Sequence, residues 1–221
     1  MATMGHSTWC TFRFQTTPAK PPAVIEHMAQ KKRGRGQIKP PSRPLVLVGL
    51  MGVGKTTVGR RLARRMSIPF VDADSEIEKA AGCSISDIFE FHGEATFREG
   101  ERRVIKRILD GPPKVVSTGG GAFIDPETRA RIRSKALSIW LRADLETILK
   151  RVKRNSNRPL LTGSDDPGTT LRRLMAERDP IYAEADLVVD SGDTAIDKVV
   201  DTILDALRDH LLENPHSRAP Q

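Results

Sequence analysis

The amino-acid sequence predicts an α/β fold with three layers, in which helices cover both faces of a central five-stranded parallel sheet. Short apolar runs alternate with helical patterns from residue 45 to residue 212, as expected for strands joined by crossover helices. The runs are continuous rather than alternating, which indicates strands buried on both faces. The most distinctive polar and glycine-rich segments follow directly after strands, where sheets of this kind bind their ligands.

These elements follow one another along the whole chain after residue 44. The strand-like runs are residues 45–48, 68–71, 115–117, 137–141 and 187–189. Helical patterns lie at about residues 55–66, 74–81, 85–91, 94–109, 126–134, 145–153, 170–178 and 194–212. Right-handed crossovers through these helices would distribute them over both sides of the sheet.

A phosphate-binding loop follows the first strand. Residues 49–56 read Gly-Leu-Met-Gly-Val-Gly-Lys-Thr, which is the G-x-x-x-x-G-K-[ST] pattern. Its glycines let backbone N–H groups surround a phosphate, and the positive end of a helix starting near Gly54 faces the same anion. In this pattern Lys55 reaches the β- and γ-phosphates and the Thr56 hydroxyl binds Mg²⁺. We expect a nucleoside triphosphate to be bound by Gly52, Val53, Gly54, Lys55, Thr56 and Thr57.

Two further candidate segments follow the second and third strands. Asp72 and Asp74 put two carboxylates at the end of the second strand, although a helix N-cap followed by a first-turn acid has the same sequence. Gly119, Gly120 and Gly121 follow the third strand, and successive glycines cost conformational entropy unless a ligand must approach bare backbone. A magnesium-binding acid often ends this strand in phosphate-loop proteins. None does here, so Asp72 is the candidate to hold the waters of the metal.

Two arginines and one polar segment complete the candidate site. Arg98 and Arg178 each lie in a charged helix, where a lone arginine is most often a solvated surface residue. Residues 155–168 are rich in Asn, Ser, Asp, Pro and Gly and include Arg158. This composition, between two helical patterns, is typical of a mobile lid.

The positive charge of the chain is concentrated at its N-terminus. The formal net charge is +8, but residues 1–44 contain eight Lys or Arg and one acidic residue, whereas the remainder has 28 basic and 27 acidic residues. The globular part therefore gives no charge-based argument for nucleic-acid binding. Residues 1–43 are rich in proline and lack apolar periodicity. We expect them, and residues 213–221, to be disordered.

Three interpretations of residues 1–43 stay open. The favoured one is an upstream start without function, since Met28 would open a shorter chain; the others are a transit peptide and a basic contact with nucleic acid or a membrane. No apolar stretch is long enough for a secretory signal or a transmembrane helix. Cys10 and Cys83 form neither a disulfide framework nor a metal site, which fits a reducing compartment. We expect a soluble cytoplasmic protein, or an organelle-targeted one if the extension is a transit peptide.

Six segments in order resemble the shikimate kinase family, and the resemblance covers about residues 44–210. They are residues 49–56, 72–74, 88–101, 119–121, 158–161 and 178–186. Only the N-terminal extension departs from the family pattern. The resemblance implies a P-loop kinase fold with a mobile lid, and transfer of the γ-phosphoryl group of ATP to the 3-hydroxyl of shikimate in aromatic amino-acid biosynthesis.

The resemblance also implies how the acceptor is bound. Arg98 and Arg178 would pair with the single carboxylate of shikimate through charge-assisted hydrogen bonds, and Glu101 would orient Arg98. Asp74 would accept a hydrogen bond from a substrate hydroxyl and take its proton. The backbone of residues 119–121 would approach a hydroxyl or the carboxylate.

On the donor side, the resemblance implies a set of charges around the transferring group. Lys55, Mg²⁺ on Thr56 and Arg158 from the lid would stabilise it, with Asp72 beside the metal through water. Arg151 is a further candidate for stacking on adenine.

Two other functions share part of this pattern. A gluconate kinase would have the same loop and a similar topology, but would not be expected to combine Asp74, Arg98, the three glycines and Arg178. A non-enzymatic binding protein of the same fold would be expected to have lost some of these residues. We expect a monomer that binds shikimate and ATP with Mg²⁺, and a core that binds neither membrane nor nucleic acid.

Overall fold

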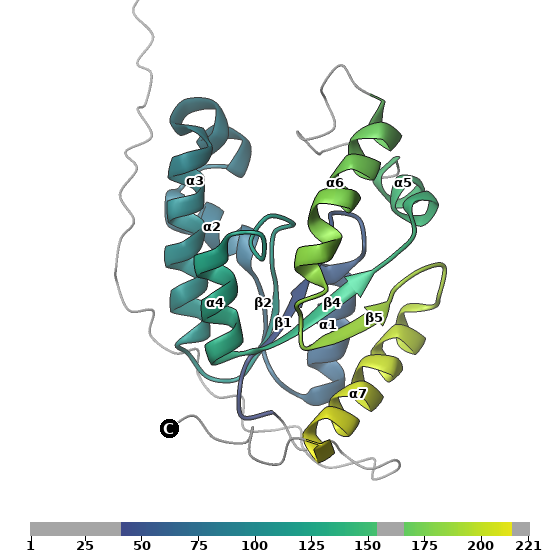
Figure 1. Cartoon of the computed structure of the whole chain (residues 1–221). Helices are drawn as coiled ribbons and strands as arrows, with labels where there is room; N and C mark the ends of the chain where they lie inside the picture. Colours follow the sequence, from purple (N-terminus) through teal and green to yellow (C-terminus); the bar gives the residue numbers. More distant parts are fainter. Residues whose placement is uncertain (1–40, 154–165, 214–221) are drawn as a thin grey trace, which may run out of the picture.

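A single parallel sheet organises the computed structural model, which describes residues 41–153 and 166–213 (Figure 1). Its five strands are β1 Leu45–Val48, β2 Phe70–Asp72, β3 Val115–Ser117, β4 Leu137–Arg142 and β5 Leu187–Asp190. The helices are α1 Lys55–Met66, α2 Ala73–Ala81, α3 Ile85–Leu109, α4 Pro126–Lys135, α5 Leu145–Lys153, α6 Pro167–Tyr182 and α7 Ile196–Glu213. The strand order is β2-β3-β1-β4-β5 and every neighbouring pair is parallel, which confirms the predicted fold class.

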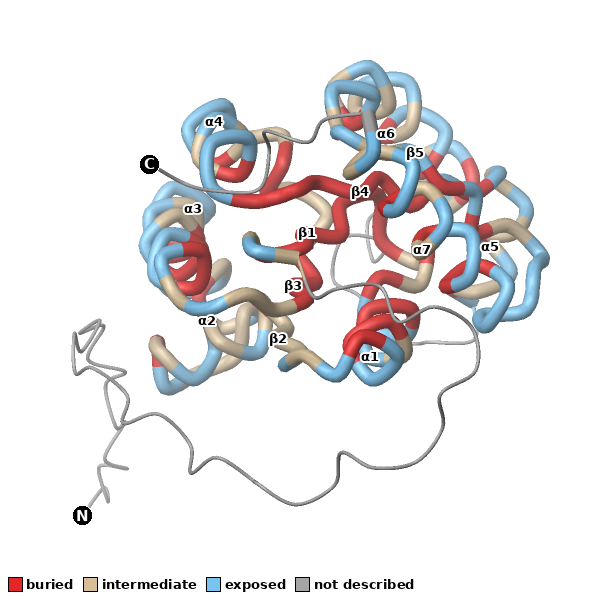
Figure 2. The backbone as a smooth tube through the Cα atoms, turned by 90° about the horizontal axis from the view of Figure 1, so that it is seen from below, coloured by how far each residue is buried: buried red, intermediate tan, exposed pale blue. Residues whose placement is uncertain are grey.

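Helices enclose the sheet in three layers. Helices α1 and α7 pack together on one face, whereas α3, α4 and α6 lie on the other. Figure 2 shows the central strands as buried and the outward sides of the helices as exposed. All four residues of β1 are fully buried, so the middle of the sheet is the hydrophobic core of the domain.

The expectation that every strand is covered on both faces is wrong for the two edge strands. All three residues of β2 are only half-buried, and Val188 of β5 is 46 % exposed. An edge strand has a neighbour on one side only, so the helices that cover the centre of the sheet cover it incompletely. The apolar run of each edge strand alone does not reveal its position in the sheet.

Several predicted boundaries shift; the largest shift is the end of α6, at Tyr182 instead of residue 178. Three of the shifts have a local reason. The second strand starts at Phe70 rather than residue 68 because the Ile68 N–H donates to the Ala63 carbonyl, 3.1 Å away, and closes the end of α1. The expected helices at 85–91 and 94–109 are one element, α3, kinked at Gly93 (φ 78°, ψ 170°). Helix α6 begins before residue 170 because Asp166 caps it and Pro167 occupies its first turn, a favourable start.

The sheet order explains why the candidate segments meet. β1, β3 and β2 are direct neighbours and run in the same direction. Their carboxyl ends therefore lie side by side, and the segments that follow them share one edge of the sheet. The phosphate loop, the two aspartates and the three glycines come together there.

Candidate active site

The phosphate loop has the local geometry that its sequence predicts. Gly54 (φ 97°) is the residue before α1 and Val58 N–H donates to its carbonyl at 2.9 Å. This left-handed backbone favours glycine and turns the first N–H groups of α1 toward the loop. Lys55 is 8 % exposed, and its Nζ donates to the carbonyls of Gly49 and Leu50 at 2.7 and 2.8 Å. The ammonium group is thus held over the loop.

A cluster of oxygen atoms lies beside the start of α1. Thr56 Oγ1 donates to Asp72 Oδ2 at 2.9 Å and lies 3.2 Å from Ser117 Oγ. The other Asp72 oxygen accepts from the Ser75 N–H at 3.4 Å and caps α2. The helix-cap interpretation of Asp72 is therefore confirmed. Its other oxygen contacts Thr56, and its role beside a metal ion stays a prediction.

Ser117 is a site residue that the sequence analysis missed. It ends β3, is 3 % exposed, and is the parallel partner of Asp72 in the sheet. A magnesium-binding acid was expected at the end of this strand, and a serine there indicates a site only once the register of β2 against β3 is known. Within residues 41–153 and 166–213, no group of three or more His, Cys, Asp or Glu side chains could hold a metal ion.

The glycines after β3 make room for protein side chains. A Cβ on Gly119 would lie 2.7 Å from Asp74 Oδ1, and a Cβ on Gly121 would lie 2.5 Å from Arg98 Nη1. Real Cβ atoms do not approach so closely, so larger residues here would displace both functional groups. From the sequence, we explained these glycines by the close approach of a ligand. The packing of Asp74 and Arg98 against them is a second reason why no larger residue fits there.

Arg98 is oriented by two acidic residues of its own helix. Its Nη1 donates to Glu101 Oε2 at 2.7 Å, and its Nη2 to Glu94 Oε1 at 3.1 Å. The Glu101 side chain is 2 % exposed and that of Arg98 25 %. Burial raises the pKa of Glu101, the Arg98 guanidinium opposes this change, and the neighbouring Asp74 and Asp125 add to it. The expected pairing of Glu101 with Arg98 is present.

The raised pKa of Glu101 predicts a pH dependence of stability. Folded Glu101 holds its proton more tightly than the unfolded side chain, so ionisation removes stability as pH rises from the ordinary value near 4.5 through the folded pKa. Glu101→Gln has no proton to lose. Its free energy of unfolding should therefore increase relative to that of the parent chain as pH rises from about 4.5 to neutral. Urea unfolding of both chains at a series of pH values measures this difference, and a difference that is constant with pH would contradict it.

Arg178 approaches the three glycines after β3 from helix α6. It lies in α6, and its Nη1 donates to the Gly120 carbonyl at 3.4 Å. Tyr182, one turn later, donates its hydroxyl to the same carbonyl. The sequence included Tyr182 in a motif but assigned it no role, because this contact depends on the packing of α6 against the loop after β3.

Arg151 is tied to the loops around the nucleotide side. Its Nη1 donates to the Val53 carbonyl at 3.2 Å, and its Nη2 to the carbonyls of Ser191 and Gly192 at 2.7 and 2.5 Å. Ser191 Oγ also donates to Val53, at 2.9 Å. These links join α5, the phosphate loop and the segment after β5. The stacking of Arg151 on adenine stays a prediction. Ser191 was not identified from the sequence.

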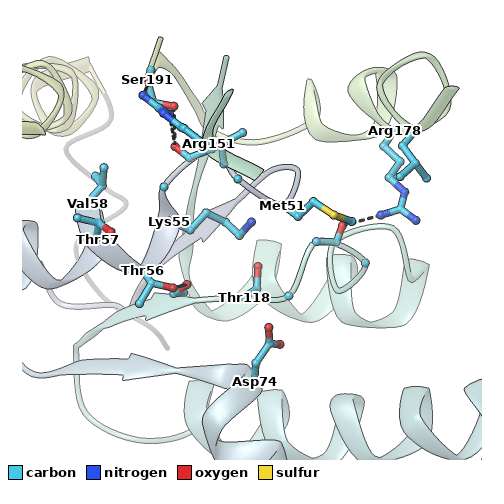
Figure 3. A pocket seen from close by; sticks show the side chains of 18 of the residues that line it. Met51, Lys55, Thr56, Thr57, Val58, Asp74, Thr118, Arg151, Arg178 and Ser191 are labelled. Atoms are coloured by element: carbon cyan, nitrogen blue, oxygen red, sulfur yellow. Dashed lines mark hydrogen bonds between the residues drawn. The ribbon is translucent and has the colours of Figure 1, made fainter. Parts of the chain in front are cut away.

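One cavity of about 1100 Å³ brings these groups together. Figure 3 shows Lys55 and Thr56 of α1, Asp74 of α2 and Arg178 of α6 around it, with Arg151 of α5 beside Ser191. The remaining predicted residues that line it are Gly52, Val53, Gly54, Thr57, Arg98, Gly119, Gly120 and Gly121. Its volume exceeds that of a typical single-ligand pocket, which suits two ligands side by side. Arg158 lies outside the described residues, as does most of the predicted lid; residues 167 and 168 belong to α6.

A phosphate loop after the central strand, beside a cavity lined by arginines and a carboxylate, defines a P-loop kinase that phosphorylates a small molecule. The chain belongs to the shikimate kinase family, whose model, described as "Shikimate kinase", matches residues 51–208. This confirms the resemblance found in the sequence.

Individual relatives agree with this assignment. The shikimate kinase of Bradyrhizobium diazoefficiens is 55 % identical over 179 residues, covering 81 % of this chain and 86 % of that protein. The shikimate kinase of Rhodopseudomonas palustris is 57 % identical over 173 residues, 78 % of this chain and 85 % of that protein. A solved structure of shikimate kinase from Acinetobacter baumannii in complex with shikimate superposes with a TM-score of 0.72 at 36 % identity, over 76 % of this chain and 93 % of that one. No helix in the described part of the chain is long and apolar enough to cross a membrane.

Proposed function

We propose that this chain transfers the γ-phosphoryl group of ATP to the 3-hydroxyl of shikimate, forming shikimate 3-phosphate and ADP for aromatic amino-acid biosynthesis. The observation that carries the proposal is the convergence of Asp74, Arg98 and Arg178 on the cavity that also contains the phosphate loop. The names of the relatives, and the shikimate bound to the Acinetobacter baumannii enzyme, support the same reaction.

On the acceptor side, the residues match the chemistry of shikimate. Arg98 and Arg178 lie in two different helices, and their guanidinium groups would both pair with one carboxylate through charge-assisted hydrogen bonds. Asp74 lies against Gly119 at the end of β2 and β3, where it would accept the proton of the attacking hydroxyl. The backbone of residues 119–121 lies against all three of these side chains.

On the donor side, the loop would bind the triphosphate, and Lys55 would stabilise the negative charge that develops on the transferring group. Arg151 borders the nucleotide end of the cavity, where its guanidinium plane would stack on adenine. Arg158 would approach the transferring group from the predicted lid and help to exclude water. Phosphoryl transfer depends mainly on such positioning and charge stabilisation.

The residues at the end of β2 and β3 fit a magnesium ion. Mg²⁺ prefers oxygen ligands and is usually held by one or two protein groups together with substrate phosphates. The Thr56 hydroxyl, the Asp72 carboxylate and the Ser117 hydroxyl supply such oxygens within one cluster. We expect Thr56 to hold the ion and Asp72 to act through water. Bound Mg²⁺ would neutralise charge on the phosphate oxygens.

Asp72→Asn should raise the Mg²⁺ concentration that nucleotide binding requires, without unfolding the chain. Asparagine also caps helices well, so the bond to Ser75 can be kept while the negative charge is lost. We expect ADP binding to require at least about tenfold more Mg²⁺, as is usual when a group behind a metal ligand is changed. Calorimetric ADP titrations at several Mg²⁺ concentrations test this, with thermal unfolding as the control for the cap. An unchanged Mg²⁺ requirement would exclude the role proposed for Asp72.

A coupled assay of ADP release tests the reaction itself. The purified chain should release ADP from MgATP with shikimate and not with gluconate. Lys55→Met should be inactive with every acceptor, which excludes a contaminating kinase. Release with gluconate but not with shikimate would overturn the proposal.

We further propose that the catalytic unit is confined to residues 44–212 and works as a monomer in the cytoplasm. A chain lacking residues 1–43 should then keep its full kcat/KM and elute as a monomer in size-exclusion chromatography. Loss of salt-sensitive DNA binding on this truncation would instead assign the extension a nucleic-acid contact.

A further inference from the structure

Tyr182 is a buried polar side chain for which the proposed chemistry has no use. It is the last residue of α6, four residues after Arg178, and is 1 % exposed. Its ring packs between Phe123 and Trp140, with centroids 6.5 and 6.0 Å away. Burial raises the pKa of its hydroxyl to about 12, so the group is a neutral donor at any working pH. Burying a hydroxyl costs free energy unless it is hydrogen-bonded, so the partner of this group decides what it contributes.

The partner of this hydroxyl lies at the meeting point of three segments. Tyr182 and Arg178 both donate to the Gly120 carbonyl, the latter at 3.4 Å. Gly120 also lies against the phosphate loop: a Cβ there would be 3.5 Å from the Met51 nitrogen and 3.8 Å from the Gly49 oxygen. The peptide of Gly120 is therefore held between α6 and the loop that binds the donor.

The ring of Tyr182 has a second link to the phosphate loop. The Tyr182 ring packs against Trp140. Trp140 in turn lies against Gly49, where a Cβ would be only 3.2 Å from Trp140 Cδ1. The phosphate loop, which would bind the donor, and the loop after β3, which would bind the acceptor, thus both contact the ring pair Trp140–Tyr182. Such a support is stiff, because aromatic side chains have few torsions and pack at high density.

We infer that Tyr182 is a positioning residue for the acceptor: its hydroxyl fixes the Gly120 carbonyl and, through this shared partner, the guanidinium of Arg178 relative to the phosphate loop. The inference rests on the proposed function. Without the hydroxyl, the only partner that the carbonyl would keep among the described residues is Arg178, through its long bond. That guanidinium would then be drawn toward the backbone and away from the substrate carboxylate, because the half-buried Gly120 carbonyl has lost its shorter hydrogen bond.

Tyr182→Phe tests the inference through a split between two Michaelis constants. We expect KM for shikimate to rise about tenfold, as for the loss of one buried hydrogen bond, while KM for ATP and ADP affinity stay unchanged. Ser138→Ala is the matched control. It removes another fully buried hydroxyl, bonded to Asp186 at 2.6 Å, and should lower thermal stability without separating the two constants.

A double-variant cycle shows whether Tyr182 acts through Arg178. If it does, Tyr182→Phe should add little to the shikimate KM of Arg178→Ala, because the partner that it positions is already absent. Full additivity, an unchanged shikimate KM, or an equal rise of both constants would each overturn the inference. A parent chain that does not phosphorylate shikimate would overturn the proposed function and the inference together, whereas a normal parent beside an unaffected Tyr182→Phe overturns the inference alone.

Discussion

Asp74→Asn is expected to lower kcat with shikimate by about 100- to 10,000-fold, the usual contribution of a general base. The amide has nearly the same shape as the carboxylate and still fits against Gly119, where the Asp74 Oδ1 lies 2.7 Å from the position of a Cβ. Shikimate should therefore bind with little loss, but the attacking hydroxyl would have no group to take its proton.

Steady-state kinetics and a shikimate binding titration separate these effects. Glu76→Gln is the matched control, since it neutralises another acid of α2 whose partners are the surface cations Lys79 and Arg107. It should leave kcat unchanged. Unimpaired turnover of Asp74→Asn would remove the proposed role of Asp74, and a large rise in KM with constant kcat would make it a binding group instead.

The edge of the sheet on which the site lies was predictable from sequence. Continuous apolar runs such as β1 and β3 indicate parallel strands, and parallel strands carry their ligands at their carboxyl ends. The phosphate loop, Asp74 and Gly120 each follow a strand directly, so their convergence required only that these strands be neighbours. The strand order β2-β3-β1 supplies this.

The residues that were missed are those whose role depends on packing between distant segments. Ser117 becomes a site residue only through the register of β3 with β2, and Ser191 only through its contact with Val53, 138 positions earlier. Tyr182 meets Gly120 because α6 crosses the loop after β3. No local propensity or spacing encodes such contacts, whereas a phosphate loop is encoded within eight residues.

Loss of Arg98 should cost both affinity and stability. Without its guanidinium, the shikimate carboxylate is unpaired in the cleft, which costs about 2–5 kcal/mol, or roughly thirtyfold to several thousandfold in kcat/KM. Arg98→Ala also leaves Glu101, 2 % exposed, without its closest cation at 2.7 Å. Because a quarter of the Arg98 side chain is exposed, we expect destabilisation near the lower end for a broken buried pair, about 3 kcal/mol.

Two further variants separate the loss of shikimate affinity from the loss of stability. Arg178→Ala should reduce kcat/KM as strongly but leave stability within about 1 kcal/mol, because no acid in the described part of the chain is paired with Arg178. Arg98→Ala combined with Glu101→Gln should recover stability, since no charge is then left unpaired, and should not recover affinity for shikimate. Urea unfolding at neutral pH and shikimate kinetics measure both quantities. If folded Arg98→Ala keeps near-normal kcat/KM, Arg98 does not bind the carboxylate; if it is as stable as Arg178→Ala, Glu101 does not depend on Arg98 for its burial.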